Sequence, residues 1–90
     1  IEASHANSRK LPARQVDVAA DVGTQISRGN EAIVGIMLES FLEEGRQNIG
    51  AGTSLVFGQS ITDPCIAWDT TEQVLADLAA ATRQRRLVNV

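Results

Sequence analysis

The sequence has few aromatic residues and a single cysteine. The first shortage limits the composition of the core, and the second excludes an internal disulfide. Aromatic residues make up 3% of the 90 residues and tyrosine is absent, so a core would rest on Ala, Val, Ile and Leu side chains. The single cysteine, Cys65, cannot form a disulfide within the chain, which fits a reducing compartment. We therefore expect a cytoplasmic protein.

Long apolar runs and clusters of basic residues are also missing. No apolar stretch is long enough for a membrane-spanning helix, and no signal peptide is visible. The formal net charge is −3 and the arginines are scattered, so no basic surface for nucleic acid is expected. With 43% apolar and 21% charged residues, the composition is that of a folded chain and not of a disordered one. These features predict a folded protein that binds neither membranes nor nucleic acid.

Two helices are predicted. Between residues 13 and 28, apolar side chains recur at the three- and four-residue steps of an amphipathic helix: Val16, Ala19, Val22 and Ile26. Gly29 follows, where a residue in the left-handed conformation commonly ends a helix. The second helix is predicted to begin at Asp69, with Asp69 and Glu72 forming a capping box. Its apolar face and its basic end are carried by Val74, Leu75, Leu78 and Ala81 and by Arg83, Arg85 and Arg86.

The strongest signal for a strand is the apolar run from Ala32 to Leu38, which ends at the carboxylate of Glu39. Because the run lacks polar alternation, it is typical of a strand covered on both faces, as in a parallel sheet flanked by helices. A weaker strand is predicted within residues 1–8, and a long loop over residues 40–68. The predicted order is strand, helix, strand, long loop and helix, an α/β arrangement. Two strands cannot cover both faces of the apolar run, so we expect further strands beside them.

Three polar residues are candidates for chemistry: His5 near the end of the first predicted strand, Glu39 at the end of the second, and Asp63 in the long loop. One imidazole and two carboxylates suit Mn²⁺, Fe²⁺, Co²⁺ or Zn²⁺. Each residue also has a structural interpretation. A lone histidine is more often a hydrogen-bonded structural residue, Glu39 could close a strand, and an aspartate before proline commonly forms a turn. From the residues alone, both interpretations stay open.

Three blocks of sequence resemble one known family in the same order. They are residues 4–8 (SHANS), residues 35–40 (GIMLES) and residues 60–66 (SITDPCI), the last followed by Trp68. The family is that of the 3-deoxy-D-arabino-heptulosonate 7-phosphate (DAHP) synthases of the microbial, short-chain type, and the likeness runs along the whole chain. Similarity to the related octulosonate 8-phosphate synthases is looser.

The resemblance implies a fold and a reaction. The fold is a (β/α)₈ barrel, of which residues 1–90 would be one carboxy-terminal piece, roughly the last two βα units of a subunit. The reaction condenses phosphoenolpyruvate with erythrose 4-phosphate, releases phosphate, and opens the shikimate pathway to aromatic amino acids. The full-length chain would form a homo-oligomer, and the piece alone would be inactive. The alternative is a non-catalytic α/β piece with a structural or subunit-contact role.

The resemblance also implies a site. In the family a cysteine, a histidine, a glutamate and an aspartate hold a divalent metal, and His5, Glu39 and Asp63 match the last three. His5 and Asp63 would also be catalytic, Asp63 by taking a proton from water. The metal-binding cysteine belongs to an earlier strand and is not Cys65. Asn7 and Ser8 are expected either to orient His5 or to form a capping turn.

Overall fold

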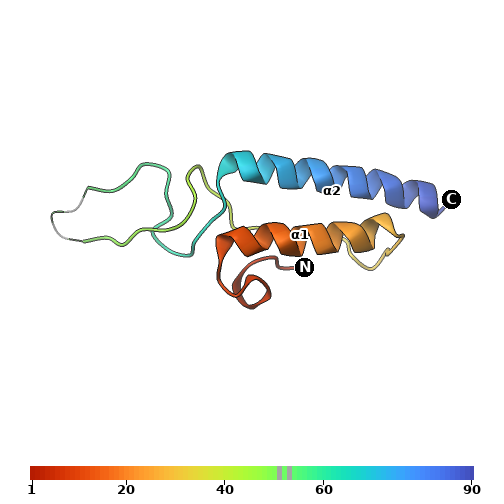
Figure 1. Ribbon diagram of the computed structural model, residues 1–90, viewed down its shortest axis with the longest axis horizontal. Helices are drawn as coiled ribbons and strands as arrows, with labels where there is room; N and C mark the ends of the chain where they lie inside the picture. The colour runs from red at the N-terminus through yellow and green to blue at the C-terminus, as the bar shows by residue number, and fades with distance from the viewer. Residues whose placement is uncertain (51, 53) are drawn as a thin grey trace.

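Two α-helices lie side by side in the computed structural model, which describes residues 1–50, 52 and 54–90 (Figure 1). In chain order these residues form a 3₁₀ turn η1 (His5–Ser8), helix α1 (Pro12–Ser27) and helix α2 (Trp68–Val88). The core comes from both helices and from the segment after α1, and its buried members are Val22, Ile26, Ile33 and Ala81. Within the described residues, neither helix is apolar enough over a sufficient length to cross a membrane.

Helix α1 confirms the first predicted helix, with one change in its buried face. Pro12 opens the helix, where its missing N–H leaves no hydrogen bond unmade. The buried side chains are Gln15, Ala19, Val22 and Ile26. Gln15 therefore takes the first position of the buried face, and the predicted Val16 is only half-buried. A buried amide needs hydrogen-bond partners, and those of Gln15 lie at the candidate site described below.

The end of α1 is a complete glycine-based cap. Gly29 has a φ of 107°, as predicted for the residue after the helix. Its N–H donates to Ile26 C=O at 3.0 Å, and Asn30 N–H donates to Gln25 C=O at 3.2 Å. These two bonds are the Schellman pattern that satisfies the last free carbonyls of a helix. The side chain of Asn89, just after α2, donates to Gly29 C=O at 3.0 Å, so the turn is tied to the second helix.

We expect Gly29→Ala to lower the free energy of unfolding by about 1–2 kcal/mol, because a left-handed backbone is unfavourable for a residue with a Cβ. The new Cβ would also lie 2.8 Å from Asn89 Oδ1 and 3.2 Å from Val88 Cγ1. Gly23→Ala is the matched control, because Gly23 lies inside α1 and a Cβ there would make only ordinary contacts with α2, at 3.8 Å from Leu78 Cδ2 and 3.9 Å from Ala81 Cβ. Urea unfolding of the two variants in a complete subunit checks this, and equal stabilities would contradict it.

The N-cap residue of helix α2 lies two residues earlier than predicted, and the predicted capping box is wrong. The helix starts at Trp68 with Ala67 as its N-cap residue, which makes no side-chain capping bond. Asp69 therefore lies inside the first turn, where its carboxylate accepts the next backbone N–H at 2.9 Å. Its charge still favours the positive end of the helix dipole. Of the predicted apolar face, Val74 and Ala81 are buried.

The predicted strand Ala32–Leu38 is reduced, in the described part of the chain, to one parallel bridge between Met37 and Glu2. Ile33 is buried, whereas Val34 is 94% exposed, so only one face of the run is covered. A continuous strand is therefore wrong for this chain, although the parallel direction is confirmed. The physical reason is that a strand is held by neighbours along its edges, and of the residues that the structure describes only the amino-terminal segment pairs with the run.

The predicted long loop is confirmed, with two of its residues, Ala51 and Thr53, outside the described ones. It begins with a parallel bridge between Ser40 and Ile66, which brings the two ends of the loop together. Gly45 and Cys65 then pair in antiparallel fashion, with N–H to C=O distances of 2.8 and 3.2 Å. The loop extends as an arm beyond one end of the helix pair (Figure 1), and the molecule measures 59 × 23 × 16 Å.

Candidate metal centre

His5 is placed by the turn that follows the amino-terminal segment. Its φ is 53°, in the left-handed region, so the chain reverses at this residue and enters η1. Lys10 N–H and Ser8 Oγ both donate to His5 C=O, at 2.8 and 3.2 Å. Asn7 Nδ2 donates to Glu2 C=O at 2.6 Å. Neither Asn7 nor Ser8 makes a hydrogen bond to the ring, so the capping-turn interpretation is right and the ring-orienting one is wrong.

Glu39 and Asp63 are positioned beside His5 by two different segments of the chain. Glu39 follows the apolar run, and its C=O accepts the N–H of Ile66 at 3.0 Å. Its side chain is 17% exposed. Asp63 lies in the loop. The C=O of the preceding residue, Thr62, accepts a hydrogen bond from Arg46 Nε at 2.7 Å, and Cys65, two positions after Asp63, pairs with Gly45. Its side chain is 60% exposed.

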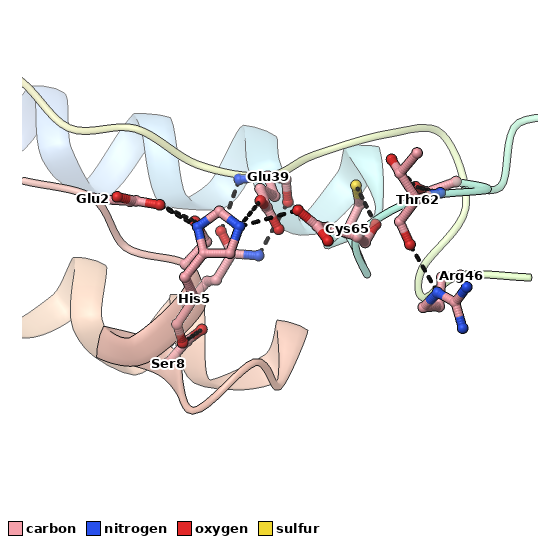
Figure 2. A network of polar contacts seen from close by, with 11 residues as sticks. Glu2, His5, Ser8, Glu39, Arg46, Thr62 and Cys65 are labelled. Carbon is pink, nitrogen blue, oxygen red and sulfur yellow. Dashed lines mark hydrogen bonds and ion pairs between the residues drawn. The ribbon is translucent and has the colours of Figure 1, made fainter.

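The carboxylates of Glu39 and Asp63 converge on one ring nitrogen of His5. His5 Nε2 lies 3.0 Å from Asp63 Oδ2 and 3.1 Å from Glu39 Oε1. One donor atom from each of the three residues lies within 4.8 Å of the others. Figure 2 shows the Glu39 carboxylate on one side of the His5 ring and Glu2 on the other. The structure therefore brings together residues up to 58 positions apart in the chain.

Glu2 is a member of the site that sequence reasoning missed. Its carboxylate accepts from His5 Nδ1, whereas Glu39 and Asp63 lie beside the other ring nitrogen, Nε2. Ser4 Oγ lies 3.2 Å from the same nitrogen and 3.3 Å from Glu2 Oε1. A carboxylate on the second ring nitrogen is the usual partner of a metal-binding histidine, because it fixes the tautomer and the ring orientation. The sequence signal that could have identified Glu2 is an acidic residue three positions before the histidine.

The charges around His5 are strongly coupled. The hydrogen bond to Glu2, followed by that to Asp63 and the charge of Glu39, raises the pKa of His5 to about 9. The His5 hydrogen bond lowers the pKa of both Glu2 and Asp63, whereas burial raises the pKa of Glu39. At neutral pH the imidazole thus carries a proton that three carboxylates stabilise. A cation is favoured at this point, and a divalent ion would replace that proton on Nε2.

The donor set fits a divalent metal in chemistry and in spacing. An imidazole nitrogen with two carboxylate oxygens is a common set for Zn²⁺, Fe²⁺, Co²⁺ or Mn²⁺. Two donors bound about 2.1 Å from one ion lie about 3.0 Å apart at a right angle and about 3.4 Å apart at the tetrahedral angle. The distances from Nε2 to the two carboxylates, 3.0 and 3.1 Å, are those of a hydrogen bond and an ion pair, and they are close to the first of these separations. These side chains need little rearrangement to hold an ion.

Cys65 lies beside this cluster without being part of it. Its Sγ donates to Asp63 C=O at 3.5 Å. Burial is the main reason that the pKa of the Cys65 thiol is raised, which disfavours the thiolate that binds metals. The described residues thus bring together the three predicted metal-binding side chains and leave Cys65 outside them.

Comparison with known proteins gives the relationship of this chain. Residues 1–76 match the model of the DAHP synthetase I family. The chain is 55% identical over 93 residues to a phospho-2-dehydro-3-deoxyheptonate aldolase of Corynebacterium glutamicum, a match that covers 96% of this chain and 25% of the relative. It is 53% identical over 85 residues to the Trp-sensitive enzyme of that name from Enterobacter agglomerans, covering 94% of this chain and 24% of the relative.

A solved structure supports the same relationship. The phospho-2-dehydro-3-deoxyheptonate aldolase of Francisella tularensis superposes with a TM-score of 0.89 at 40% identity, over 94% of this chain and 24% of that chain. The chain therefore spans about a quarter of the length of the relatives that it matches. With a family model over residues 1–76 and identities above 50% to curated members, the chain belongs to the DAHP synthetase I family.

Proposed function

We propose that residues 1–90 are the carboxy-terminal part of one (β/α)₈ barrel, its last two βα units. The supporting observations are the parallel bridges, which join Glu2 to Met37 and Ser40 to Ile66, and the helices that follow each extended segment. Val34 is exposed, and its segment has one paired neighbour among the described residues, as expected for a barrel strand without its other partners. The DAHP synthase family and the superposition on a family structure support the same assignment.

As part of such a barrel, the chain takes part in the condensation of phosphoenolpyruvate with erythrose 4-phosphate to DAHP and phosphate. The observation that carries this proposal is the convergence of His5, Glu39 and Asp63 in a member of this family. In α/β barrels, catalytic groups gather at the carboxyl ends of strands and in the loops that follow them. Glu39 and Asp63 hold those two kinds of position here.

The three side chains would hold a divalent ion, with Mn²⁺, Fe²⁺, Co²⁺ and Zn²⁺ as the candidates. When bound, such an ion polarises the aldehyde carbonyl of the sugar phosphate or activates a water. His5 offers Nε2, and Glu2 on Nδ1 keeps the ring in place. The methylene carbon of phosphoenolpyruvate bonds to the aldehyde carbon, and the aldehyde oxygen becomes a hydroxyl by gaining a proton that balances the one lost by water. Water adds at the adjacent carbon, whose bond to the phosphate oxygen then breaks as the ketone forms and phosphate leaves. Asp63, with its exposed carboxylate, accepts the proton of that water.

A replacement experiment tests this function against a purely structural role. Residues 1–90 are expressed alone and, separately, in place of the matching segment of the Corynebacterium glutamicum relative, which makes a complete subunit. We expect phosphate release from phosphoenolpyruvate that depends on erythrose 4-phosphate only in the complete subunit, because residues 1–90 make up about a quarter of such a chain. Activity of residues 1–90 alone, or a folded and metal-loaded complete subunit without activity, would refute the proposal.

Glu2 gives a second, independent expectation. In the complete subunit, Glu2→Gln keeps the size of the side chain and weakens its bond to His5 Nδ1. We expect Mn²⁺ affinity to fall about 10- to 100-fold, the usual effect of removing the partner of a metal-binding histidine. Glu31→Gln, whose carboxylate accepts from Asn89 far from His5, is the control. Equal Mn²⁺ affinities in equilibrium dialysis would show that Glu2 does not support the ring.

The homo-oligomeric state and the cytoplasmic location stay predictions. Size-exclusion chromatography with light scattering of the complete subunit measures the first.

A further inference from the structure

The buried side chain of Gln15 holds both backbone groups of Glu39. Gln15 lies near the start of α1 and is 1% exposed. Its amide oxygen accepts a hydrogen bond from Glu39 N–H at 2.8 Å, and its amide nitrogen donates to Glu39 C=O at 3.1 Å. One side-chain amide thus pairs with Glu39 as a neighbouring peptide group would pair with it in a sheet.

An amide suits this pair of bonds at neutral pH, because its oxygen accepts and its nitrogen donates. A carboxylate accepts but does not donate, and an apolar side chain of the same size does neither. The other buried positions of the same helix face are Ala19, Val22 and Ile26. An apolar residue at position 15 would continue that face, so core packing does not explain a glutamine there. Its bonds to Glu39 do.

Glu39 is held from a second direction as well. Its C=O also accepts the N–H of Ile66 at 3.0 Å, so α1 and the end of the loop both fix the same peptide. The Glu39 carboxylate lies 3.1 Å from His5 Nε2. A cavity of about 140 Å³ is lined by Gln15 together with His5, Glu39 and Asp63. Gln15 therefore lines the same cavity as the three converging side chains.

We propose that Gln15 is a positioning residue of the candidate metal centre: by pairing with the backbone of Glu39, it sets where the Glu39 carboxylate meets His5. The inference rests on the proposed function. A metal site requires its donors to stay within about 0.5 Å of the productive geometry. Backbone pairing by a buried side chain supplies that precision at a strand end whose sheet is incomplete in this chain.

The test is Gln15→Met in the complete subunit, which keeps the length of the side chain and removes both hydrogen bonds. We expect the dissociation constant for Mn²⁺, measured by equilibrium dialysis, to rise about 10- to 100-fold. The electron paramagnetic resonance spectrum of the bound Mn²⁺ should also change, because one carboxylate is displaced. Val22→Ala is the matched control: it is buried on the same helix face and lies in the core cluster away from Glu39. It should lower stability and leave Mn²⁺ binding and the spectrum unchanged.

The outcomes separate the inference from the function on which it rests. Normal Mn²⁺ affinity in Gln15→Met, with loss in Glu39→Ala, overturns the positioning role and leaves the metal centre standing. An equal loss in Val22→Ala overturns it too, because general destabilisation would then explain the effect. Normal affinity in Glu39→Ala overturns the metal centre itself. If Gln15→Met does not fold, Gln15→Glu, which keeps an acceptor for Glu39 N–H, is measured by the same criteria.

Discussion

Replacing Glu39 or His5 with alanine in the complete subunit is expected to lower Mn²⁺ affinity more than about 100-fold, and activity with it. Each change removes a donor atom from the cluster in which His5 Nε2 and Glu39 Oε1 lie 3.1 Å apart. Loss of a supporting partner alone costs about 10- to 100-fold, so loss of a donor should exceed that range. Equilibrium dialysis with Mn²⁺ and phosphate release from phosphoenolpyruvate measure the two effects.

Glu43→Ala is the control for this experiment, because Glu43 is an exposed carboxylate of the same loop that lies outside the cluster. It should bind Mn²⁺ and turn over as the parent does. Near-normal metal content and turnover in either His5→Ala or Glu39→Ala would reject the metal centre. A loss of the same size in Glu43→Ala would point instead to general destabilisation of the loop.

The second large effect is expected for Asp63→Asn. The asparagine keeps a carbonyl oxygen that can still contact the ion, but it cannot accept a proton from water. If Asp63 is the base, turnover at saturating Mn²⁺ should fall by about two to four orders of magnitude, the range of a lost general base. The 60% exposure of the Asp63 side chain is consistent with access to water. Turnover against added Mn²⁺, with bound metal counted in parallel, is the measurement.

Asp69→Asn makes the same chemical change at an exposed position in the first turn of α2, and it should leave turnover unchanged. If excess Mn²⁺ restores most of the activity of Asp63→Asn, then Asp63 serves as a ligand only. That outcome would remove the proton transfer from the proposed function while keeping the three-residue site.

Part of the candidate site could be predicted from the sequence, and part could not. His5, Glu39 and Asp63 were identified by the blocks that carry the family resemblance, and the structure brings their donor atoms together. Spacing along the chain did not reveal this, because the contacts join residues as far apart as 58 positions. Glu2 and Gln15 were missed as members of the site. Glu2 contacts His5 and Gln15 contacts Glu39 only in the folded chain, and no local sequence pattern predicts these contacts.

The two helices and the cap at Gly29 were determined by the sequence alone. Their signals are local: apolar side chains at three- and four-residue steps, and a glycine where the backbone needs a positive φ. Even so, the predicted N-cap of α2, Asp69, lies two residues after the observed one, because Ala67 caps the helix without any side-chain bond. Local signals thus determine that a helix exists more firmly than where it begins.

Only the tertiary structure decided the strand pairing and the candidate metal centre. The run Ala32–Leu38 has the composition of a buried strand, but strand hydrogen bonds require a neighbour, and among the described residues the run has one only around Met37. The site likewise exists because packing brings the amino-terminal turn, the end of that run and the loop to one point. A helix satisfies its hydrogen bonds within its own segment, whereas a sheet and a metal site are made by segments that meet only after folding.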